Sequence, residues 1–174
     1  MITVTLTPTE QSMAERIGRQ RHELRMQRGA ETHGNAKLAQ KLNRRSEHNE
    51  MGAVAEYALA KHYGDGILQD WLENRAFVED HKKIVCDLGS LVQVRATDKA
   101  HGGLVVQSYD EARFSYVLGI TNRVNRTVTF VGWQSGSAVM RERYWMGAWP
   151  KPAYLYPQSD LLDMDLLPPE DLLC

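Results

Sequence analysis

The alternation of apolar and polar side chains in residues 84–97 predicts two short strands joined by a turn that contains Gly89. Because successive side chains of a strand point to opposite faces, Gln93 and Arg95 should share one face of the second strand while its valines face the core. The turn should bring Asp87, at the end of the first strand, toward the same edge. An acid, an amide and a guanidinium are therefore expected to converge beside this turn.

Helical periodicity is clearest in residues 50–63, which are rich in alanine, contain no proline and are followed by Gly64. Glu56 lies close to the border of the apolar face of this predicted helix. A carboxylate in that position more often points to solvent, and only the downstream strands make it a candidate for the same site. An earlier helix is expected after Thr7, because Thr7 and Glu10 have the spacing of a capping box.

Further strands are expected at residues 104–106, 114–120 and 127–133, with a polar hairpin loop at 121–126. Residues 144–156 are rich in aromatic side chains and proline, so we expect them to cross the surface without regular structure. Together these elements predict an α+β fold, or a three-layer α/β-like one. A central mixed β-sheet would be flanked by helices and preceded by a basic helical segment.

Charge divides the chain into three predicted parts. The 174 residues carry a net charge of −1, yet residues 13–45 hold nine Lys/Arg against three Glu, and residues 159–174 hold five acids and no base. We therefore expect a basic helical N-terminal segment at 1–48, a nuclease-like α/β core at 49–158, as explained below, and an acidic, leucine-rich tail at 159–174.

The basic segment suggests an anionic partner, because clustered positive charge attracts phosphate without reading sequence. The residues expected to hold the backbone of a nucleic acid, in the first place DNA, are Arg16, Arg19, Arg25, Lys41, Arg44 and Arg45. The alternative is a solvated amphipathic helix whose arginines pair with Glu15 and Glu23. The segment contains no aromatic residue, so base stacking is not expected there.

The cysteines and the hydropathy of the chain bear on its compartment. Cys86 and Cys174 show no pairing pattern, which suggests a reducing environment. No stretch approaches the ~18 apolar residues of a membrane-spanning helix, and the N-terminus lacks the pattern of a signal peptide. We therefore expect a soluble, cytoplasmic protein with no membrane partner.

Three short motifs, in this order along the chain, resemble the core of the PD-(D/E)XK nuclease superfamily. They are Gly-x-x-x-Glu in residues 52–56, Asp-x-Gly in 87–89 and Val-Arg in 94–95. They look most like the motifs of small phage-encoded proteins of this type, and the resemblance covers roughly residues 51–167. It implies a restriction-endonuclease-like core and hydrolysis of DNA phosphodiesters with Mg²⁺ or Mn²⁺ as cofactor.

By this resemblance, the catalytic residues are Glu56, Asp87, Gln93 and Arg95, and the first three of them are also the metal ligands. Asp87 would be the principal ligand, with Glu56 contributing from the helix. The metal would neutralise charge on the phosphate and supply a water of lowered pKa. The implied function is a divalent-metal-dependent endo- or exonuclease of phage type.

Two of these positions depart from the pattern of the superfamily. Gln93 stands where most members have an acid, and its neutral carbonyl oxygen is a weaker Mg²⁺ ligand. Arg95 stands in place of the usual lysine and cannot act as a general base at neutral pH, although it can bind phosphate. A catalytically inactive nuclease-fold protein that binds nucleic acid or a protein partner is therefore the alternative. Taken singly, Asp87 could also be an ordinary turn residue.

The C-terminal third of the chain contains two apolar features with more than one interpretation. The acidic Leu/Met tail could dock on a protein partner, but we favour the interpretation that its leucines pack on their own domain while its acids face water. Trp133, Trp145 and Trp149 are interpreted as packing residues rather than as platforms for stacked bases.

Overall fold

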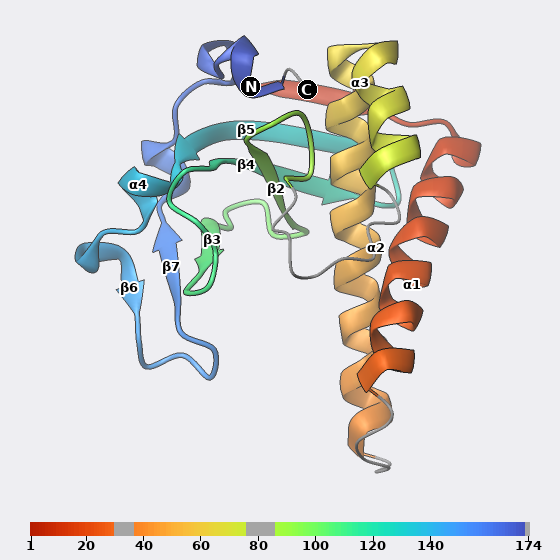
Figure 1. Cartoon of the computed structure of the whole chain (residues 1–174), viewed down its shortest axis with the longest axis horizontal. Helices are drawn as coiled ribbons and strands as arrows, with labels where there is room; N and C mark the ends of the chain where they lie inside the picture. Colours follow the sequence, from red (N-terminus) through yellow and green to blue (C-terminus); the bar gives the residue numbers. More distant parts are fainter. Residues whose placement is uncertain (30–36, 76–85, 173–174) are drawn as a thin grey trace.

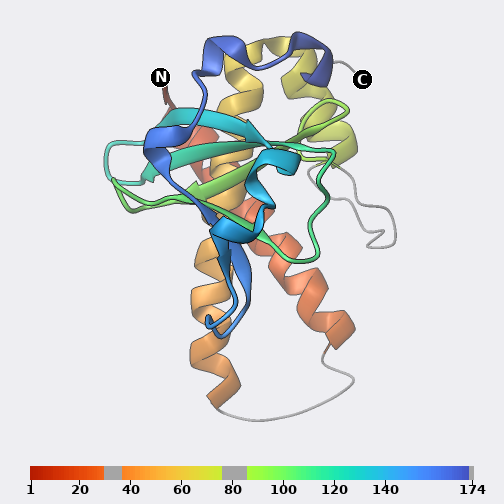
Figure 2. The same cartoon turned by 90° about the vertical axis from the view of Figure 1, so that its left-hand side faces the viewer.

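The computed structural model describes residues 1–29, 37–75 and 86–172, and within them all side chains except those of residues 25, 28–29, 37–45 and 75. Long helices, a mixed β-sheet and a smaller second sheet form three layers (Figures 1 and 2). This arrangement is an α+β fold, as the sequence predicts. None of the helices in the described part of the chain combines the length and the apolar composition that crossing a bilayer needs.

The larger sheet is mixed and has four strands. In spatial order they are β1 (Ile2–Thr5), β5 (Thr127–Ser135), β4 (Ser115–Asn122) and β2 (Val92–Thr97). β1 and β4 each pair antiparallel with β5, whereas β2 pairs parallel with β4. The predicted strand over residues 92–97 is therefore confirmed as β2, whereas the strand predicted before it lies largely outside the described residues.

Helices cover one face of this sheet (Figure 2). They are α1 (Pro8–Gly29), α2 (Lys37–Tyr63) and α3 (Asp65–Asp70), followed by a π-helical turn (Trp71–Arg75). The predicted capping box is confirmed, because the Thr7 amide donates to the Glu10 carboxylate at 2.7 Å and the Glu10 amide donates to the Thr7 hydroxyl at 3.2 Å. α2 ends before Gly64, as expected, but it begins far earlier than residue 50 and runs through the predicted segment boundary at residues 48–49.

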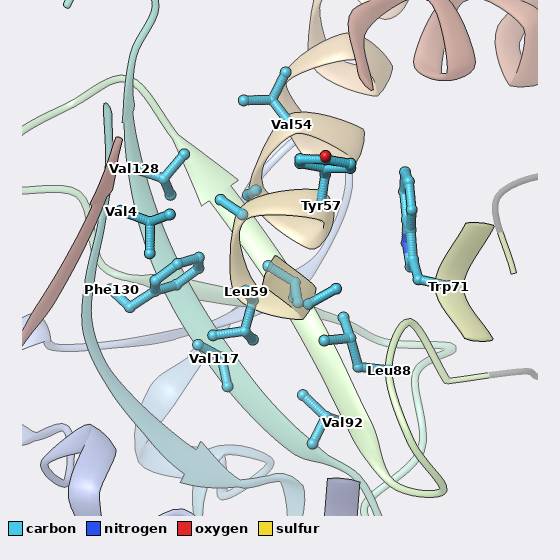
Figure 3. Packing of buried hydrophobic residues seen from close by; sticks show 14 of the residues in the cluster. Val4, Val54, Tyr57, Leu59, Trp71, Leu88, Val92, Val117, Val128 and Phe130 are labelled. Atoms are coloured by element: carbon cyan, nitrogen blue, oxygen red, sulfur yellow. The ribbon is translucent and has the colours of Figure 1, made fainter. Parts of the chain in front are cut away.

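The main core lies between α2 and the four-stranded sheet (Figure 3). Leu59 of α2 packs among the inward side chains of the sheet, including Val92, Val117 and Phe130. α1 contributes to the same core through Ala14 and Ile17, so it belongs to the same compact body as the strands. Burial of these apolar side chains away from water stabilises the packing of the helices on the sheet.

A second, three-stranded sheet covers the other face. In order it contains β3 (Leu104–Gln107), β7 (Ala153–Tyr156) and β6 (Trp145–Met146), all antiparallel. The outward residues of β4, Tyr116 and Leu118, pack against it in a second cluster with Leu104 and Val106. The expectation that residues 144–156 lack regular structure was wrong. β7 forms because β3, almost fifty residues earlier, supplies a partner that no local pattern reveals.

The remaining elements are short helices that close this side of the molecule and hold the C-terminal tail. They are α4 (Gly136–Val139) and 3₁₀ turns at Glu142–Tyr144, Gln158–Asp160, Met164–Leu166 and Pro169–Leu172. In the tail, Met164, Leu167 and Leu172 are buried in the main core, whereas Asp160, Asp163 and Asp165 are exposed. The preferred interpretation of the tail, leucines inward and acids outward, is confirmed for these residues. It was wrong for Leu162 and Leu166, which are exposed, and for Asp171, whose buried carboxylate accepts the Ser115 hydroxyl.

Candidate functional site

A tight turn places Asp87 at the beginning of β2. The amides of Asp87 and Leu88 both donate to the Val92 carbonyl, and the Val92 amide donates back to Leu88, at distances of 2.9 to 3.2 Å. The Asp87 carboxylate then accepts the Val94 amide at 2.7 Å. Gly89 allows the turn, because its φ of +54° lies in the left-handed region and a Cβ would lie 2.4 Å from the Leu172 backbone. The Asp87 side chain is therefore fixed to the edge of β2.

Gln93 and Arg95 lie on the same face of β2, opposite the core valines, as the period-two pattern predicts. Gln93 is buried, and its side-chain oxygen accepts a hydrogen bond from Arg95 Nη1 at 3.2 Å. The same Nη1 lies 3.9 Å from Asp87 Oδ2, and the guanidinium lies over the Tyr116 ring at 5.2 Å. The amide, the guanidinium and the acid thus converge as expected.

Glu56 reaches this region from α2, where it is buried rather than solvent-facing. Arg21 Nη1 of α1 donates to both of its oxygens, at 2.8 and 3.0 Å, and Trp71 Nε1 donates to Oε2 at 3.0 Å. The Arg21 guanidinium also lies over the Trp71 ring at 5.5 Å. Glu56 is therefore a fully partnered buried carboxylate.

The charge of Glu56 acts on Asp87. Burial and, next, the charge of Glu56 raise the pKa of Asp87 to about 7, although Arg95, the Val94 amide and Arg21 oppose the rise. A carboxyl close to a second carboxyl in a poorly hydrated site favours its neutral form. Asp87, Gln93 and Arg95 therefore form one cluster of the turn and β2, whereas Glu56 is linked to it through its charge on Asp87 and has its own partners, Arg21 and Trp71.

Asp110, which holds Arg95 in place, was not predicted from the sequence. Asp110 lies on the loop between β3 and β4, accepts Arg95 Nη2 and the Gln107 amide at 2.8 Å each, and has a side chain only 13% exposed. Burial lowers the pKa of Arg95, but the charges of Asp110 and Asp87 together raise it by more. The net effect is a raised pKa. Nothing in the local pattern marks this residue, because the crossover from β2 to β4 brings it to Arg95.

Arg21 was also missed, although a signal existed. It follows Ala14 and Ile17, both buried, at helical spacing, so it continues the buried stripe of α1. Burial lowers the pKa of Arg21, but the charge and hydrogen bond of Glu56, with a contribution from Asp87, raise it to a net increase. An arginine within a buried stripe requires an acid, and in this protein that acid is Glu56.

The basic N-terminal segment is partly neutralised by acids from other elements. Arg16 is exposed, whereas Arg19 pairs with Glu50 of α2 at 3.2 Å. The alternative, in which arginines of the helix pair with Glu15, was wrong for this acid, because Arg123 of the β4–β5 loop pairs with Glu15 at 2.9 Å and with Glu50 at 3.0 Å. The side chains of Arg25, Lys41, Arg44 and Arg45 lie outside the described part of the structure.

The site can be tested for its fit to a divalent cation by its donor atoms. Two carboxylates and one amide carbonyl supply the hard oxygen ligands that Mg²⁺ and Mn²⁺ prefer. Within residues 1–29, 37–75 and 86–172, however, no group of three or more His, Cys, Asp or Glu side chains could hold a metal. The donor types alone thus suit such a cation, and its binding by Asp87, Gln93 and Glu56 stays a prediction.

Comparisons of the chain with protein-family models, with curated proteins and with solved structures found no match. The resemblance to the PD-(D/E)XK superfamily thus depends on the quoted motifs, and the function that it implies stays a prediction.

Proposed function

We propose that this protein is a divalent-metal-dependent nuclease that hydrolyses DNA phosphodiesters at the cluster of Glu56, Asp87, Gln93 and Arg95. The observation that supports this proposal is that Asp87, Gln93 and Arg95 meet at one edge of the mixed sheet, where Arg95 Nη1 donates to Gln93 and lies 3.9 Å from Asp87 Oδ2. The buried carboxylate of Glu56, on the neighbouring helix, contributes through its charge to the raised pKa of Asp87. By resemblance to small phage proteins, its place of action is the cytoplasm of an infected cell.

Each residue has a distinct task in this proposal. Asp87, with Gln93 and Glu56, would hold Mg²⁺ or Mn²⁺, which when bound supplies charge neutralisation and a water of lowered pKa. Arg95 binds the phosphate and stabilises the negative charge that develops on it, since a guanidinium can donate two parallel hydrogen bonds to phosphate oxygens. Asp110 and Gln93 keep Arg95 oriented for that contact.

The charge balance explains why phosphate binding at this cluster should need the metal. When ionised, Glu56, Asp87 and Asp110 carry three negative charges, against two positive charges on Arg21 and Arg95. This net negative charge repels a phosphodiester, and a divalent cation reverses its sign. DNA binding at this cluster is therefore expected to depend on the metal, whereas binding by basic residues elsewhere is not.

A specific observation favours a second candidate, a nuclease-fold protein that binds nucleic acid without cutting it. Both oxygens of Glu56 already accept hydrogen bonds, from Arg21 and Trp71. Metal ligation by Glu56 must compete with this pairing, and the arginine in place of the usual lysine cannot accept a proton from water. A weak or absent cutting activity is the expectation of this candidate.

The test is incubation of the purified protein with supercoiled plasmid and with single- and double-stranded oligonucleotides, in Mg²⁺, Mn²⁺ or EDTA. Asp87→Asn, which keeps an acceptor for the Val94 amide, should reduce metal-dependent cutting by about a hundredfold or more. The double variant Gln93→Glu with Arg95→Lys restores the residue types of the superfamily and should cut faster than the wild type. Glu111→Gln, a change at a half-buried residue whose carboxylate pairs with Arg113, should cut at the wild-type rate.

Three outcomes would decide against the nuclease. Cutting that is equal in the wild type and in Asp87→Asn would assign the activity to a contaminant. Salt-sensitive binding without cutting, in the wild type and in the double variant alike, would establish the second candidate. Absence of both binding and cutting would direct the search to a protein partner.

A further inference from the structure

The hairpin formed by β6 and β7 carries exposed aromatic rings. We refer to residues 141–156 as the aromatic hairpin. Trp145 is 39% exposed and Trp149 is 36% exposed, whereas Trp133 is buried and donates its indole N–H to the Asp163 carbonyl at 3.1 Å. The packing interpretation is thus confirmed for Trp133. It does not account for the two tryptophans of the hairpin, each of which leaves more than a third of its surface in water.

Two ring pairs join the hairpin to the second sheet. Trp145 packs against Tyr154 with ring centroids 4.9 Å apart, and Tyr144 packs against Tyr156 at 4.6 Å. The pair with Tyr154 fixes the plane of the Trp145 ring to β7 and leaves part of that ring in water. Rigid aromatic rings that are backed by other rings are well suited to stacking with flat ligands, because little conformational freedom is lost on binding.

The charge of the hairpin matches an anionic ligand. Residues 136–159 contain Arg141, Arg143 and Lys151 against a single acid, Glu142, and all three basic residues are exposed. The Arg143 guanidinium lies over the Tyr144 ring at 4.6 Å, an example of the cation–π geometry that also occurs around nucleic-acid bases. Exposed tryptophans between arginines and a lysine are the combination with which proteins bind single strands of nucleic acid.

The aromatic hairpin is connected to the candidate site through β3 and shares no residue with it. β7 pairs with β3, and β3 leads directly into the loop that carries Asp110. Figures 1 and 2 show the hairpin extending from the sheet in the same direction as the far end of the α1–α2 pair. A nucleic-acid strand bound to the aromatic hairpin could therefore continue from the hairpin onto the part of the protein that contains the candidate site.

We propose that the aromatic hairpin is a binding surface for unpaired nucleotides, in which Trp145 and Trp149 stack on bases while Arg141, Arg143 and Lys151 contact phosphates. The proposal rests on the proposed function only for the choice of nucleic acid as the partner. It requires neither the metal nor any residue of the Asp87 cluster. Bases stacked in a duplex do not offer their faces, so single strands are bound in preference to duplexes.

The experiment measures binding in EDTA, where metal-dependent cutting does not occur. Fluorescein-labelled oligo(dT), oligo(rU) and a duplex of equal length are titrated with the protein, and anisotropy and tryptophan fluorescence are recorded. The expected result is tighter binding of the single strands than of the duplex, with quenching of tryptophan fluorescence. Trp145→Ala and Trp149→Ala should each weaken binding at least about fivefold, equivalent to ~1 kcal/mol of lost stacking.

Matched variants separate stacking from folding. Val124→Ala shortens a side chain that is 87% exposed on the β4–β5 loop and should leave binding unchanged. Trp145→Phe with Trp149→Phe keeps aromatic rings and should retain more affinity than the corresponding double alanine variant. Circular dichroism establishes that each variant is folded.

Several outcomes would overturn the proposal. They are absence of binding to both single strands, binding without any change in tryptophan fluorescence, and equal affinity of the wild type and the folded double alanine variant. Failure of the proposed nuclease function is a separate result, since it leaves plasmid uncut with Mg²⁺ while oligo(dT) binding in EDTA persists. Conversely, metal-dependent cutting with no contribution from the two tryptophans would preserve the nuclease and reject this surface.

Discussion

At the scale of single residues, Arg95 is held in one orientation by its neighbours. Its Nη2 donates to Asp110, its Nη1 donates to Gln93 and to the Val94 carbonyl, and its plane lies over the Tyr116 ring. A guanidinium that is fixed in this way loses little freedom when it binds phosphate, so orientation contributes to affinity. The pair with Asp110 is the part of this arrangement that a substitution can isolate.

Asp110→Asn tests that pair. Asparagine keeps an acceptor for the Gln107 amide but removes the charge beside Arg95, so we expect the free energy of unfolding to fall by about 1–3 kcal/mol. Urea denaturation measures the change. The neighbouring substitution Glu111→Gln breaks a more exposed pair with Arg113 and should cost less than ~1 kcal/mol. Equal losses of unfolding free energy in the two variants would show that the Arg95–Asp110 pair stabilises the fold no more than the more exposed Glu111–Arg113 pair does.

The raised pKa of Asp87 predicts a pH dependence of stability. Its pKa of about 7 in the folded protein exceeds the ordinary value of 3.8, so between these pH values the folded state binds more protons than the unfolded state. The contribution of Asp87 is therefore fully present below pH 3.8 and is lost as the pH rises through about 7. We expect the unfolding free energy of the wild type to fall, relative to Asp87→Asn, by at most about 4 kcal/mol over this range.

Urea denaturation in EDTA at a series of pH values between these limits tests the prediction. EDTA is needed because a metal bound to Asp87 would lower its pKa. A difference between the wild type and Asp87→Asn that does not change with pH would contradict the expectation.

At the scale of elements, the crossing of α1 over α2 decides where Arg21 meets Glu56. Gly18 lies at this crossing, and a Cβ at that position would lie 2.5 Å from the Asn49 carbonyl oxygen and 2.5 Å from the Glu50 Cα. Only glycine lets the two helices approach so closely. Arg21, almost one turn later on α1, reaches the site because of this approach.

Gly18→Ala should therefore destabilise the protein, by about 1–3 kcal/mol, because backbone atoms must move apart to admit the methyl group. Thermal unfolding followed by circular dichroism measures the loss. Gly52→Ala is the matched control in the other helix, where the nearest atom to a new Cβ is Glu56 Oε1 at 3.9 Å. This control should be neutral or should stabilise by up to ~1 kcal/mol through helix propensity. The same response in both variants would argue against a tight crossing.

At the scale of the whole molecule, the acidic tail is part of the fold. The Asp171 carbonyl accepts the amides of Ser90 and Leu91, in the turn that positions Asp87, and its carboxylate accepts the Ser115 hydroxyl at 2.6 Å. The tail therefore holds the turn next to Asp87 through hydrogen bonds, while Leu167 and Leu172 pack in the main core. Removing it should affect both stability and the turn.

Two adjacent leucines provide the test. Leu167 is 6% exposed and Leu166 is 63% exposed. Leu167→Ala should lower the free energy of unfolding by about 2–4 kcal/mol, whereas Leu166→Ala should change it by less than ~0.5 kcal/mol. Deletion of residues 159–174 should prevent stable folding, since the lost burial is comparable to the whole stability of a domain. A folded truncated protein would support the interpretation of the tail as a free docking segment.

The local patterns that predicted structure correctly are those whose cause is local. The Thr7–Glu10 capping box, the end of α2 before Gly64 and the alternation of Gln93 and Arg95 along β2 depend on residues a few positions apart. That Glu56 acts together with Asp87 is implied by the resemblance and stays a prediction. The position of Glu56 on its helix alone suggested a solvent-facing residue, whereas the structure buries it.

The partners of those residues could not be predicted, because they come from distant parts of the chain. Asp110 reaches Arg95 through the crossover between two parallel strands, and Arg21 reaches Glu56 through a helix crossing made possible by Gly18. Residues 144–156 form strands only because β3 offers an unpaired edge, and their sequence alone suggested an irregular segment.

By itself, the amino-acid sequence determined the elements whose hydrogen bonds and apolar faces have a short period: α1, the C-terminal half of α2, strands β2 to β5 and the alternation of side chains along β2. It also indicated that leucines of the tail pack on the domain. Only the tertiary structure decided which charges meet, which tryptophans stay in water and that Glu56 and Asp171 are buried. The physical reason is that burial and ion pairing act between side chains close in space, whatever their separation along the chain.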